Sequence, residues 1–409
     1  MQARIKHPWL MWSFIVLFYF YQYFLRVCPV VLTEELTSYF RLDASELGSF
    51  SAFYFFIYAF LQIPVGLLID RFGSKFVIPS ACLVCGLGTL ILGLSPSFWL
   101  ATIGRFLQGA GSSFAFIGMI YITAHYFPIS LLGFLICLGD SLGKLGAVFA
   151  SGPFAKTIEY VSWRSSLLGI GCLGVILSLG LYFTLPRACS TQETLSITSL
   201  KHTLKTLVEE KSMWMICLVS SLLVVTTTAF AGLWGAVFLE ISYSMSKTSA
   251  SFAISVFFLG SMLGSPSLGY ISDRLGKRKP FLFIAGFFGT LLFSLLVYYP
   301  YFSTLGVYTL LFILGILTSI QNLTYCVAIE NNPPKYKGAI TGYVNLFVFL
   351  LGAISQPLVG FLMERHSTVI FKSSGVYTLK DFQYSFGFFP LCFALAFVFV
   401  FFINDKKKV

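Results

Sequence analysis

The sequence predicts an all-α membrane protein with twelve transmembrane helices arranged in two six-helix halves. Three observations predict this fold: the composition, twelve long apolar runs and an internal repeat. Hydrophobic residues make up 57% of the 409 positions, charged residues make up 11%, and the mean hydropathy is +0.85. A soluble domain carries about 25% charged residues because its surface must face water. Lipid is therefore expected to surround most of this chain.

Each of the apolar runs is long enough to cross a bilayer, which takes about 20 residues of helix. The first run is too long for the apolar core of a signal peptide and has no small-residue cleavage site, so we expect it to be the first span. Runs longer than about 22 residues imply tilted helices or helices that extend beyond the bilayer. The twelve runs lie near residues 8–36, 46–67, 76–94, 98–125, 131–155, 165–186, 213–239, 247–269, 280–299, 301–330, 338–363 and 382–403.

The basic residues predict the orientation of the spans. If the N-terminus is cytoplasmic, 17 Lys and Arg residues lie in cytoplasmic segments and 7 on the other side. This bias predicts a multi-pass protein of the bacterial inner membrane with both termini in the cytoplasm. The net charge of +11 then reflects membrane edges, so no nucleic-acid partner is expected.

Cysteine and histidine give no sign of a metal or a cofactor. The nine cysteines are scattered through apolar runs, as expected of small buried hydrophobic residues, and no helix carries two histidines at i and i+4. No P-loop motif is present, so ATP-driven transport is not predicted. The chain is expected to act without a metal or cofactor, as a monomer.

A polar segment divides the chain into the two halves. Residues 187–212 form the longest stretch between spans on the predicted cytoplasmic side, and we expect a linker there with a short surface helix around 198–210. The N-terminal half is then 1–186 and the C-terminal half 213–409. A motif between the second and third spans recurs in the second half with an offset of 203 residues, which indicates duplicated halves. It reads Gly66-x-x-x-Asp70-Arg71-x-Gly73 in the first copy and Gly269-x-x-x-Asp273-Arg274-x-Gly276 in the second.

Each residue type that is repeated in the two copies has a physical explanation. Gly66 and Gly269 are expected to let neighbouring helices approach closely. The second glycine of each copy is expected to adopt a positive φ in a tight turn. The aspartates, Asp70 and Asp273, stand where a carboxylate can meet a helix N-terminus or a basic partner.

Two copies of this loop in a chain of twelve spans resemble the major facilitator superfamily, and the resemblance covers about residues 8–403. It implies a secondary transporter that works by alternating access, not an enzyme. It also implies that the two loops are a cytoplasmic gate, whose latch breaks during transport. The alternative is a plain turn rich in positive charge.

Arg26 is the leading candidate for substrate binding. A charged residue at bilayer depth costs at least about 2.5–3.5 kcal/mol on insertion scales, so it usually serves a function. Tyr19, Tyr23 and Arg26 share one face of the first span at i, i+4 and i+7. A guanidinium beside two tyrosines is suited to an anionic group. The alternatives are an internal salt bridge or a side chain that extends to the membrane surface.

Two further positions carry charge inside spans. Asp140 and Lys144 lie one turn apart on the fifth span. They form a self-neutralising pair, or Asp140 carries a coupling proton, or Lys144 supplies a second positive contact to substrate. Arg105 begins Arg105-x-x-Gln108-Gly109-x-Gly111 on the fourth span, which resembles a family motif associated with proton coupling or substrate contact. Structural pairing is the alternative.

The second half offers polar but uncharged groups at mid-span. Trp234, Asn322 and Tyr325 are the candidates for substrate contact, and each could instead hold helices together. A charged site facing an uncharged one fits a small anionic or zwitterionic substrate. The expected substrate is a small carboxylate-bearing solute, moved by proton coupling or by facilitated diffusion. Amino acids or dipeptides are favoured, because the first span and its exit, Arg26-Val27-Cys28-Pro29, resemble the phagosomal nutrient and lysosomal dipeptide branches. The alternatives are an organic anion, organophosphate or siderophore transporter or exporter, and a membrane sensor that does not transport.

Overall fold

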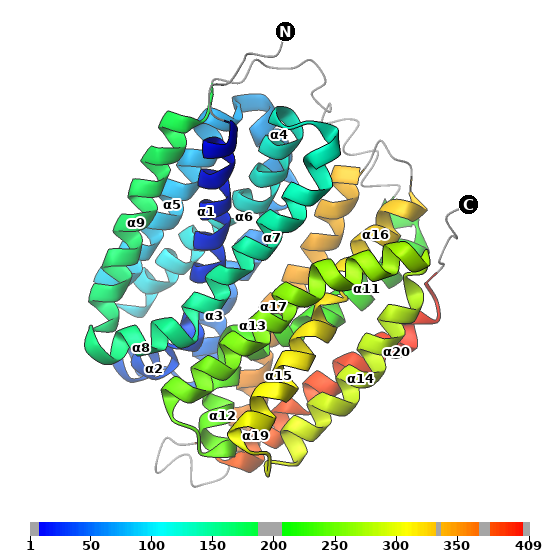
Figure 1. The fold of residues 1–409 in the computed structure, drawn as a ribbon. Helices are drawn as coiled ribbons and strands as arrows, with labels where there is room; N and C mark the ends of the chain where they lie inside the picture. Colours follow the sequence, from blue (N-terminus) through cyan, green and yellow to red (C-terminus); the bar gives the residue numbers. More distant parts are fainter. Residues whose placement is uncertain (1–7, 187–206, 333–336, 368–376, 404–409) are drawn as a thin grey trace.

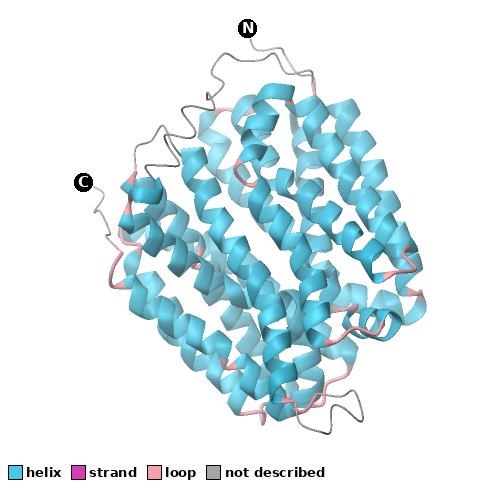
Figure 2. Ribbon diagram, turned by 180° about the vertical axis from the view of Figure 1, so that it is seen from behind, coloured by secondary structure: helices cyan, strands magenta, loops and turns pink. Residues whose placement is uncertain are grey.

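The computed structural model describes residues 8–186, 207–332, 337–367 and 377–403, and every regular element in these ranges is a helix (Figures 1 and 2). Twelve of the helical segments are long and apolar enough to cross a membrane. The predicted all-α, twelve-span fold is therefore confirmed. The expected linker and its surface helix lie outside the described residues except for the last few positions.

The first six spans lie together in space. They are α1 (Pro8–Val27) with its 3-10 extension η1 (Cys28–Val30), α3 (Ala44–Leu61) followed by α4 (Pro64–Phe72), α5 (Ser74–Leu94), α6 (Phe98–Tyr126), α7 (Ile129–Ala150) followed by α8 (Gly152–Tyr160), and α9 (Trp163–Thr184). The short helix α2 (Thr33–Phe40) connects the first two spans.

The last six spans form a second group. They are α11 (Lys211–Val225) with the π-helix η2 (Thr226–Trp234) and α12 (Gly235–Tyr243), α13 (Lys247–Leu275), α14 (Lys279–Tyr298), α15 (Thr304–Ser319) with α16 (Asn322–Asn331), α17 (Lys337–His366), and α19 (Leu379–Phe386) with α20 (Phe388–Val400).

The start of α1 and the end of α20 lie at the same end of the helical bundle (Figure 1). We call it the terminal end, and the other end, which carries α2, α8, α12 and α19, the opposite end. Figure 1 shows that the two groups of helices stand side by side and diverge toward the terminal end.

Proline explains why the first span is shorter than predicted. The apolar run extends to about residue 36, but the span ends at Val30. Pro29 has no N–H group, so it cannot continue the helical hydrogen bonding, and the chain tightens into η1. Thr33 then donates its hydroxyl to the carbonyls of Pro29 and Val30 at 3.2 and 2.9 Å, and α2 begins as a separate helix.

The helix α3 begins, at the opposite end of the bundle, with a capping box. The Glu46 N–H donates to Asp43 Oδ1 at 2.7 Å, and the Asp43 N–H donates to Glu46 Oε2 at 3.1 Å. These bonds satisfy backbone donors that a helix N-terminus leaves free. Glu364, from the end of α17, accepts a further hydrogen bond from the Ser45 N–H at 2.6 Å. One helix start is thus held by carboxylates from both groups of spans.

The two groups contact each other mainly through α3 against α17 and through α7 and α8 against α13. A Cβ atom added at Gly48 would lie 2.6 Å from the Gln356 carbonyl oxygen, so α3 and α17 touch backbone to backbone. On the other flank, Ser255 donates to the Val148 carbonyl at 2.7 Å and accepts from the Gly152 N–H at 2.8 Å. Glycine and serine permit this close approach between membrane helices.

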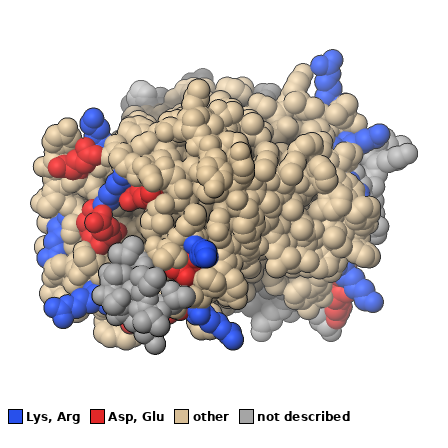
Figure 3. Space-filling view, turned by 90° about the horizontal axis from the view of Figure 1, so that it is seen from below, with Lys and Arg blue, Asp and Glu red and all other residues tan. Residues whose placement is uncertain are grey.

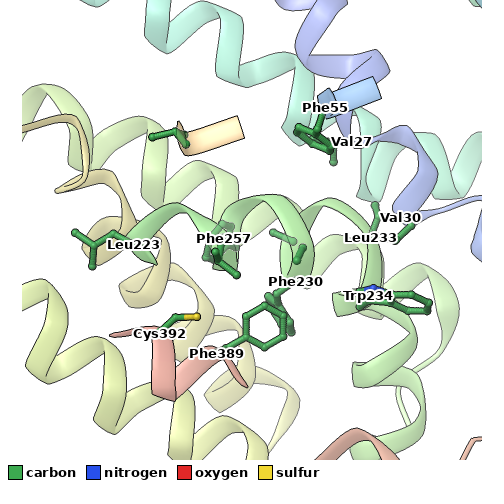
Figure 4. Close-up of a cluster of buried hydrophobic side chains, with 14 of the residues drawn as sticks. Val27, Val30, Phe55, Leu223, Phe230, Leu233, Trp234, Phe257, Phe389 and Cys392 are labelled. Carbon is green, nitrogen blue, oxygen red and sulfur yellow. The ribbon is translucent and has the colours of Figure 1, made fainter. Parts of the chain in front are cut away.

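An apolar layer joins the two groups near the opposite end. Figure 4 shows Val27 beside Phe55 and Val30 beside Leu233, with Trp234 next to them. All five side chains are buried. The Trp234 Nε1–H donates to the Gln356 carbonyl at 3.0 Å, which ties the π-helix to α17. Tight apolar packing here excludes water from this path between the groups.

Charged side chains surround this layer at the opposite end. Lys247, at the start of α13, pairs with Glu34 at 3.3 Å and also with Glu35, both on α2. Figure 3, which looks onto this end, shows charged residues toward its edge and other residue types over its middle. Ion pairs at the rim and apolar contacts inside together hold this end closed.

The two repeated loops adopt the predicted turn but not the predicted helix contact. Gly73 and Gly276 have φ of 81° and 63°, so the expected positive φ is confirmed. A Cβ atom at Gly66 or Gly269 would meet no atom of the described residues within 4 Å. The expectation that these two glycines let helices approach closely is therefore wrong for this conformation, because the helices diverge at the terminal end.

In the second loop, Asp273 has a basic partner, and that partner is Arg278. The Arg278 guanidinium donates to Asp273 and, at 3.1 Å, to Glu330 at the end of the tenth span. Burial lowers the pKa of Arg278, but these hydrogen bonds outweigh that effect and the pKa lies above its ordinary value. Arg71 and Arg274 are exposed. The side chain of Asp70 lies outside the described part of the chain.

Candidate functional site

Arg26 lies where the two groups of spans meet, enclosed by aromatic rings. Its guanidinium carbon lies 4.7 Å from the ring centre of Tyr23, 4.9 Å from that of Tyr58 on α3, and 4.8 Å from that of Phe349 on α17. The Tyr58 and Phe349 rings themselves pack edge to face at 4.4 Å. We call these four residues the Arg26 cluster. A cation over ring faces away from water gains about 2 kcal/mol.

The Arg26 guanidinium is only partly satisfied by the protein. It donates to Gln22 Oε1 at 2.9 Å, while its buried Nε–H has no hydrogen-bond partner. No carboxylate lies within 4 Å of Arg26 among the residues that the structure describes. With 9% of its surface exposed, Arg26 is a buried cation that retains an unused donor and an unbalanced charge.

A chain of hydrogen bonds crosses between the two groups beside this cluster. Asn345, on α17, donates to Gln62 Oε1 of α3 at 3.1 Å. Tyr325, on α16, donates its hydroxyl to Asn345 Oδ1. Gln62 lies one helical turn from Tyr58 toward the terminal end, so this amide and phenol chain flanks the Arg26 cluster on that side.

Lys144 and Asp140 form an ion pair on the other flank of the cluster. Lys144 Nζ lies 2.8 Å from Asp140 Oδ2, and the Tyr19 hydroxyl donates to Asp140 Oδ1 at 3.2 Å. The Tyr19 ring packs at 5.1 Å from the Tyr23 ring, which connects the pair to the Arg26 cluster. Gly143 makes room for Tyr19, because a Cβ atom there would lie 2.2 Å from the tyrosine ring.

Arg105 is completely buried behind the ring of Tyr54. Its guanidinium carbon lies 4.7 Å from that ring centre. Arg105 Nη1 donates to the Leu25 carbonyl at 2.7 Å and to Gln108 Oε1 at 2.8 Å. Gln108 in turn donates to the Thr89 hydroxyl at 2.9 Å. Arg105 thus contacts the end of α1 directly and cannot be reached by a solute in this conformation.

Six of the nine candidate residues inside spans gather around Arg26, and three do not. Tyr19, Tyr23, Arg26, Asp140, Lys144 and Tyr325 belong to the connected set described above. Trp234 lies in the apolar layer, Asn322 donates to the Ser265 hydroxyl at 2.7 Å within its own group of spans, and Arg105 lies behind Tyr54.

Sequence reasoning missed three residues that contact Arg26. Gln22 precedes Arg26 by one helical turn, so its spacing could have identified it. Tyr58 follows Tyr54 at i+4 on the second span, and this pair of tyrosines on one helix face could have identified it as a site residue. Phe349 offers none, because it is one of 46 phenylalanines.

This arrangement is suited to binding an anion. It presents the Arg26 guanidinium and several hydroxyl groups in a desolvated setting where charge-assisted hydrogen bonds are strong, while the Lys144 ammonium is paired with Asp140. The described residues contain no group of three His, Cys, Asp or Glu side chains that could hold a metal ion. The guanidinium and hydroxyl groups around Arg26 can recognise a solute.

Curated relatives of the chain include transport and sensor proteins of bacteria. The membrane sensor protein UhpC of Escherichia coli is 24% identical over 385 residues, which cover 87% of this chain and 85% of that protein. The probable sulfoacetate transporter SauU of Cupriavidus necator is 24% identical over 387 residues, which cover 89% of each. A probable L-galactonate transporter of Escherichia coli is 22% identical over 367 residues, which cover 83% of this chain and 79% of that protein.

Solved structures share the fold. A bacterial homolog of the human lysosomal transporter Spinster, in an inward-facing and occupied conformation, superimposes with a TM-score of 0.77 at 15% identity, covering 98% of this chain and 97% of that one. A model of the Major Facilitator Superfamily matches residues 12–357 and 216–409. The chain therefore belongs to the major facilitator superfamily, as a twelve-span secondary transporter and not an enzyme.

Proposed function

We propose that this protein transports a small organic anion, which binds to Arg26 between the two halves and is released by alternating access. One observation carries the proposal: Arg26 is a buried guanidinium with an unused donor and no carboxylate partner among the described residues. An unpaired buried charge is strongly destabilising. An anionic solute would supply the missing charge and the missing hydrogen-bond acceptor.

The named relatives support an organic anion over an amino acid or a dipeptide. Sulfoacetate and L-galactonate, in the names of two relatives, are both organic anions. The same relatives give no support to the phagosomal nutrient and lysosomal dipeptide branches. Residues 1–186 and 213–409 are the two halves that move, and the excess of basic residues supports a bacterial inner membrane with the terminal end in the cytoplasm.

Alternating access requires the opposite end to open when the terminal end closes. The contacts of Ser45 with Glu364 and of Lys247 with α2 are the ones that must break. The repeated loops around Gly66 and Gly269 would then meet at the terminal end and act as the latch.

The test is binding and counterflow of organic anions with purified protein. Sulfoacetate, L-galactonate and hexose 6-phosphate are screened by isothermal titration in detergent, and ligands that bind are then followed in proteoliposomes. Arg26→Ala should abolish binding and counterflow, whereas Arg26→Lys should only weaken them, because lysine keeps the charge but loses the planar fork. Arg365→Ala, at an exposed arginine on α17, is the control.

Wild-type affinity in Arg26→Ala would overturn the proposal. Binding that depends on Arg26 but is never accompanied by counterflow would favour a sensor that does not transport. One relative, UhpC, is named as a membrane sensor protein.

A further inference from the structure

The Lys144–Asp140 pair has a consequence for the charge of the substrate. The pair is closed at 2.8 Å, and the second oxygen of Asp140 accepts from the Tyr19 hydroxyl. Both carboxylate oxygens are therefore occupied, and the lysine charge is cancelled by a partner one turn away on the same helix. Lys144 is 7% exposed, so its ammonium has little water to exchange for the carboxylate.

Among the buried cations that the structure describes within the spans, this pairing leaves Arg26 as the one that can bind a solute. Among the described residues, the groups that contact the Arg26 guanidinium are neutral: the amide of Gln22 and the rings of Tyr23, Tyr58 and Phe349. Arg105 is also charged, but it is fully buried behind Tyr54 and a solute cannot contact it. The other half contributes the neutral side chains of Asn345 and Tyr325.

Charge matching then separates two classes of organic anion. A carboxylate with a single charge pairs with Arg26 and is fully balanced. A phosphate monoester carries about −1.5 to −2 charges at pH 7, and its second charge would be buried beside the Asp140 carboxylate without a cationic partner. Burying an unpaired charge is costly, and like charges at close range add to that cost. The relatives' named solutes do not decide the matter, because L-galactonate is a monoanion and sulfoacetate a dianion.

We propose that Asp140 determines substrate charge: by neutralising Lys144 it restricts the site at Arg26 to monoanions and excludes dianions such as phosphate monoesters. This inference rests on the proposed function. In this proposal Asp140 does not contact the solute. It pairs with Lys144, so that the Lys144 ammonium cannot bind the solute.

The experiment compares two ligands of similar size, a hexonate with one charge and hexose 6-phosphate with two. Isothermal titration gives the ratio of their dissociation constants for wild-type protein and for Asp140→Asn. Asparagine is nearly isosteric and can still accept from Tyr19, but it leaves Lys144 charged and unpaired. Wild type should prefer the hexonate. Asp140→Asn should move the ratio toward the phosphate by about tenfold or more, the value of one additional charge-assisted hydrogen bond.

A double variant separates charge from structure. Asp140→Asn with Lys144→Met removes both charges, and replacing an ion pair by neutral groups of similar volume is often tolerated. The double variant should return the ratio to the wild-type value, which a purely structural role of Asp140 does not predict. It also keeps the test open if Asp140→Asn alone does not fold.

Three results would overturn the inference. Equal affinity of wild type for the two ligands excludes discrimination by charge. A ratio unchanged in Asp140→Asn, with binding still dependent on Arg26, refutes the role of Asp140 and leaves the proposed function intact. If wild type binds neither these ligands nor sulfoacetate, the proposed function fails and this inference fails with it.

Discussion

Arg105 and Leu25 lie 80 residues apart in the chain, yet Arg105 Nη1 donates a 2.7 Å hydrogen bond to the Leu25 carbonyl. In a continuous helix that carbonyl would accept from the N–H of residue 29. Residue 29 is a proline and has no N–H, so the fourth span supplies the donor that the first span lacks. Arg26 follows Leu25 directly, and its backbone is thereby fixed at the end of α1.

The first prediction concerns this bond. Arg105→Met should leave the Leu25 carbonyl buried without its strong donor, which costs about 1–3 kcal/mol, and should disturb the position of Arg26. Anion affinity should fall by about fivefold or more. Pro29→Ala provides a backbone N–H at the missing position, so the double variant Arg105→Met with Pro29→Ala should recover much of the lost affinity. Isothermal titration of the four proteins measures the coupling.

The family resemblance implies proton coupling or substrate contact for Arg105. If Arg105 acted in proton coupling, Pro29→Ala would not restore the affinity lost in Arg105→Met. Losses in the two single variants that simply add in the double variant would therefore count against a structural role of the Arg105–Leu25 bond.

The second prediction concerns closure of the opposite end. Gly48→Val places a branched side chain where a Cβ atom alone would lie 2.6 Å from the Gln356 carbonyl. Overpacking of this kind costs about 1–3 kcal/mol, and opening the opposite end relieves it. Spin labels at positions 160 and 301, which are exposed and lie in different groups of spans, should report a longer distance by double electron–electron resonance in a cysteine-free background.

Gly169→Val is the matched control, because a Cβ atom at Gly169 meets nothing within 4 Å. An identical distance distribution in Gly48→Val and wild type would show that the contact between α3 and α17 does not limit opening.

The third prediction concerns Glu364 and the start of α3. Glu364→Ala removes the oxygen that accepts from the Ser45 N–H. A hydrogen bond of this kind contributes about 0.5–1.5 kcal/mol. The population open at the opposite end should rise by about two- to tenfold in the same spin-label measurement. Arg365→Gln, at the exposed neighbouring residue, should leave the populations as in wild type, and an equal shift in both variants would argue against a specific role for the cap.

The fourth prediction concerns the room that Gly143 gives to Tyr19. Gly143→Ala puts a methyl group where the ring now lies, 2.2 Å from its nearest atom, so Tyr19 must turn away from Asp140. We expect anion affinity to fall by about tenfold, because Tyr19 also packs against Tyr23 in the Arg26 cluster. The comparison is Gly169→Ala on the sixth span, α9, and equal affinity in the two variants would contradict the prediction.

Local patterns in the sequence were enough for the span count and the turns. Asp140 and Lys144 could be expected to pair, because residues four apart lie on one face of any helix. Gly73 and Gly276 could be expected to take a positive φ, because their place after each Asp-Arg dipeptide marks a tight turn. The predicted first span is too long, because hydropathy does not detect that Pro29 has no backbone N–H group.

The partners of the buried arginines could not be predicted in this way. Tyr58 and Phe349 reach Arg26 from the second and eleventh spans, and the Leu25 carbonyl reaches Arg105 across 80 residues. Their spacing in the chain carries no period that brings them together. The same holds for the wrong expectation about Gly66 and Gly269, whose surroundings depend on which end of the bundle is open.

Residue patterns along the chain establish a duplicated bundle of twelve membrane helices with a few charges at bilayer depth, since lipid admits only apolar helical segments and each charge there stands out. They also predict the pairing of Lys144 with Asp140, which lie one turn apart on one helix. The surroundings of the two buried arginines depend on distances of a few ångströms between different helices, so they required the tertiary structure: Arg105 donates to the Leu25 carbonyl behind Tyr54, whereas Arg26 lies among rings and one amide where the two groups of spans meet.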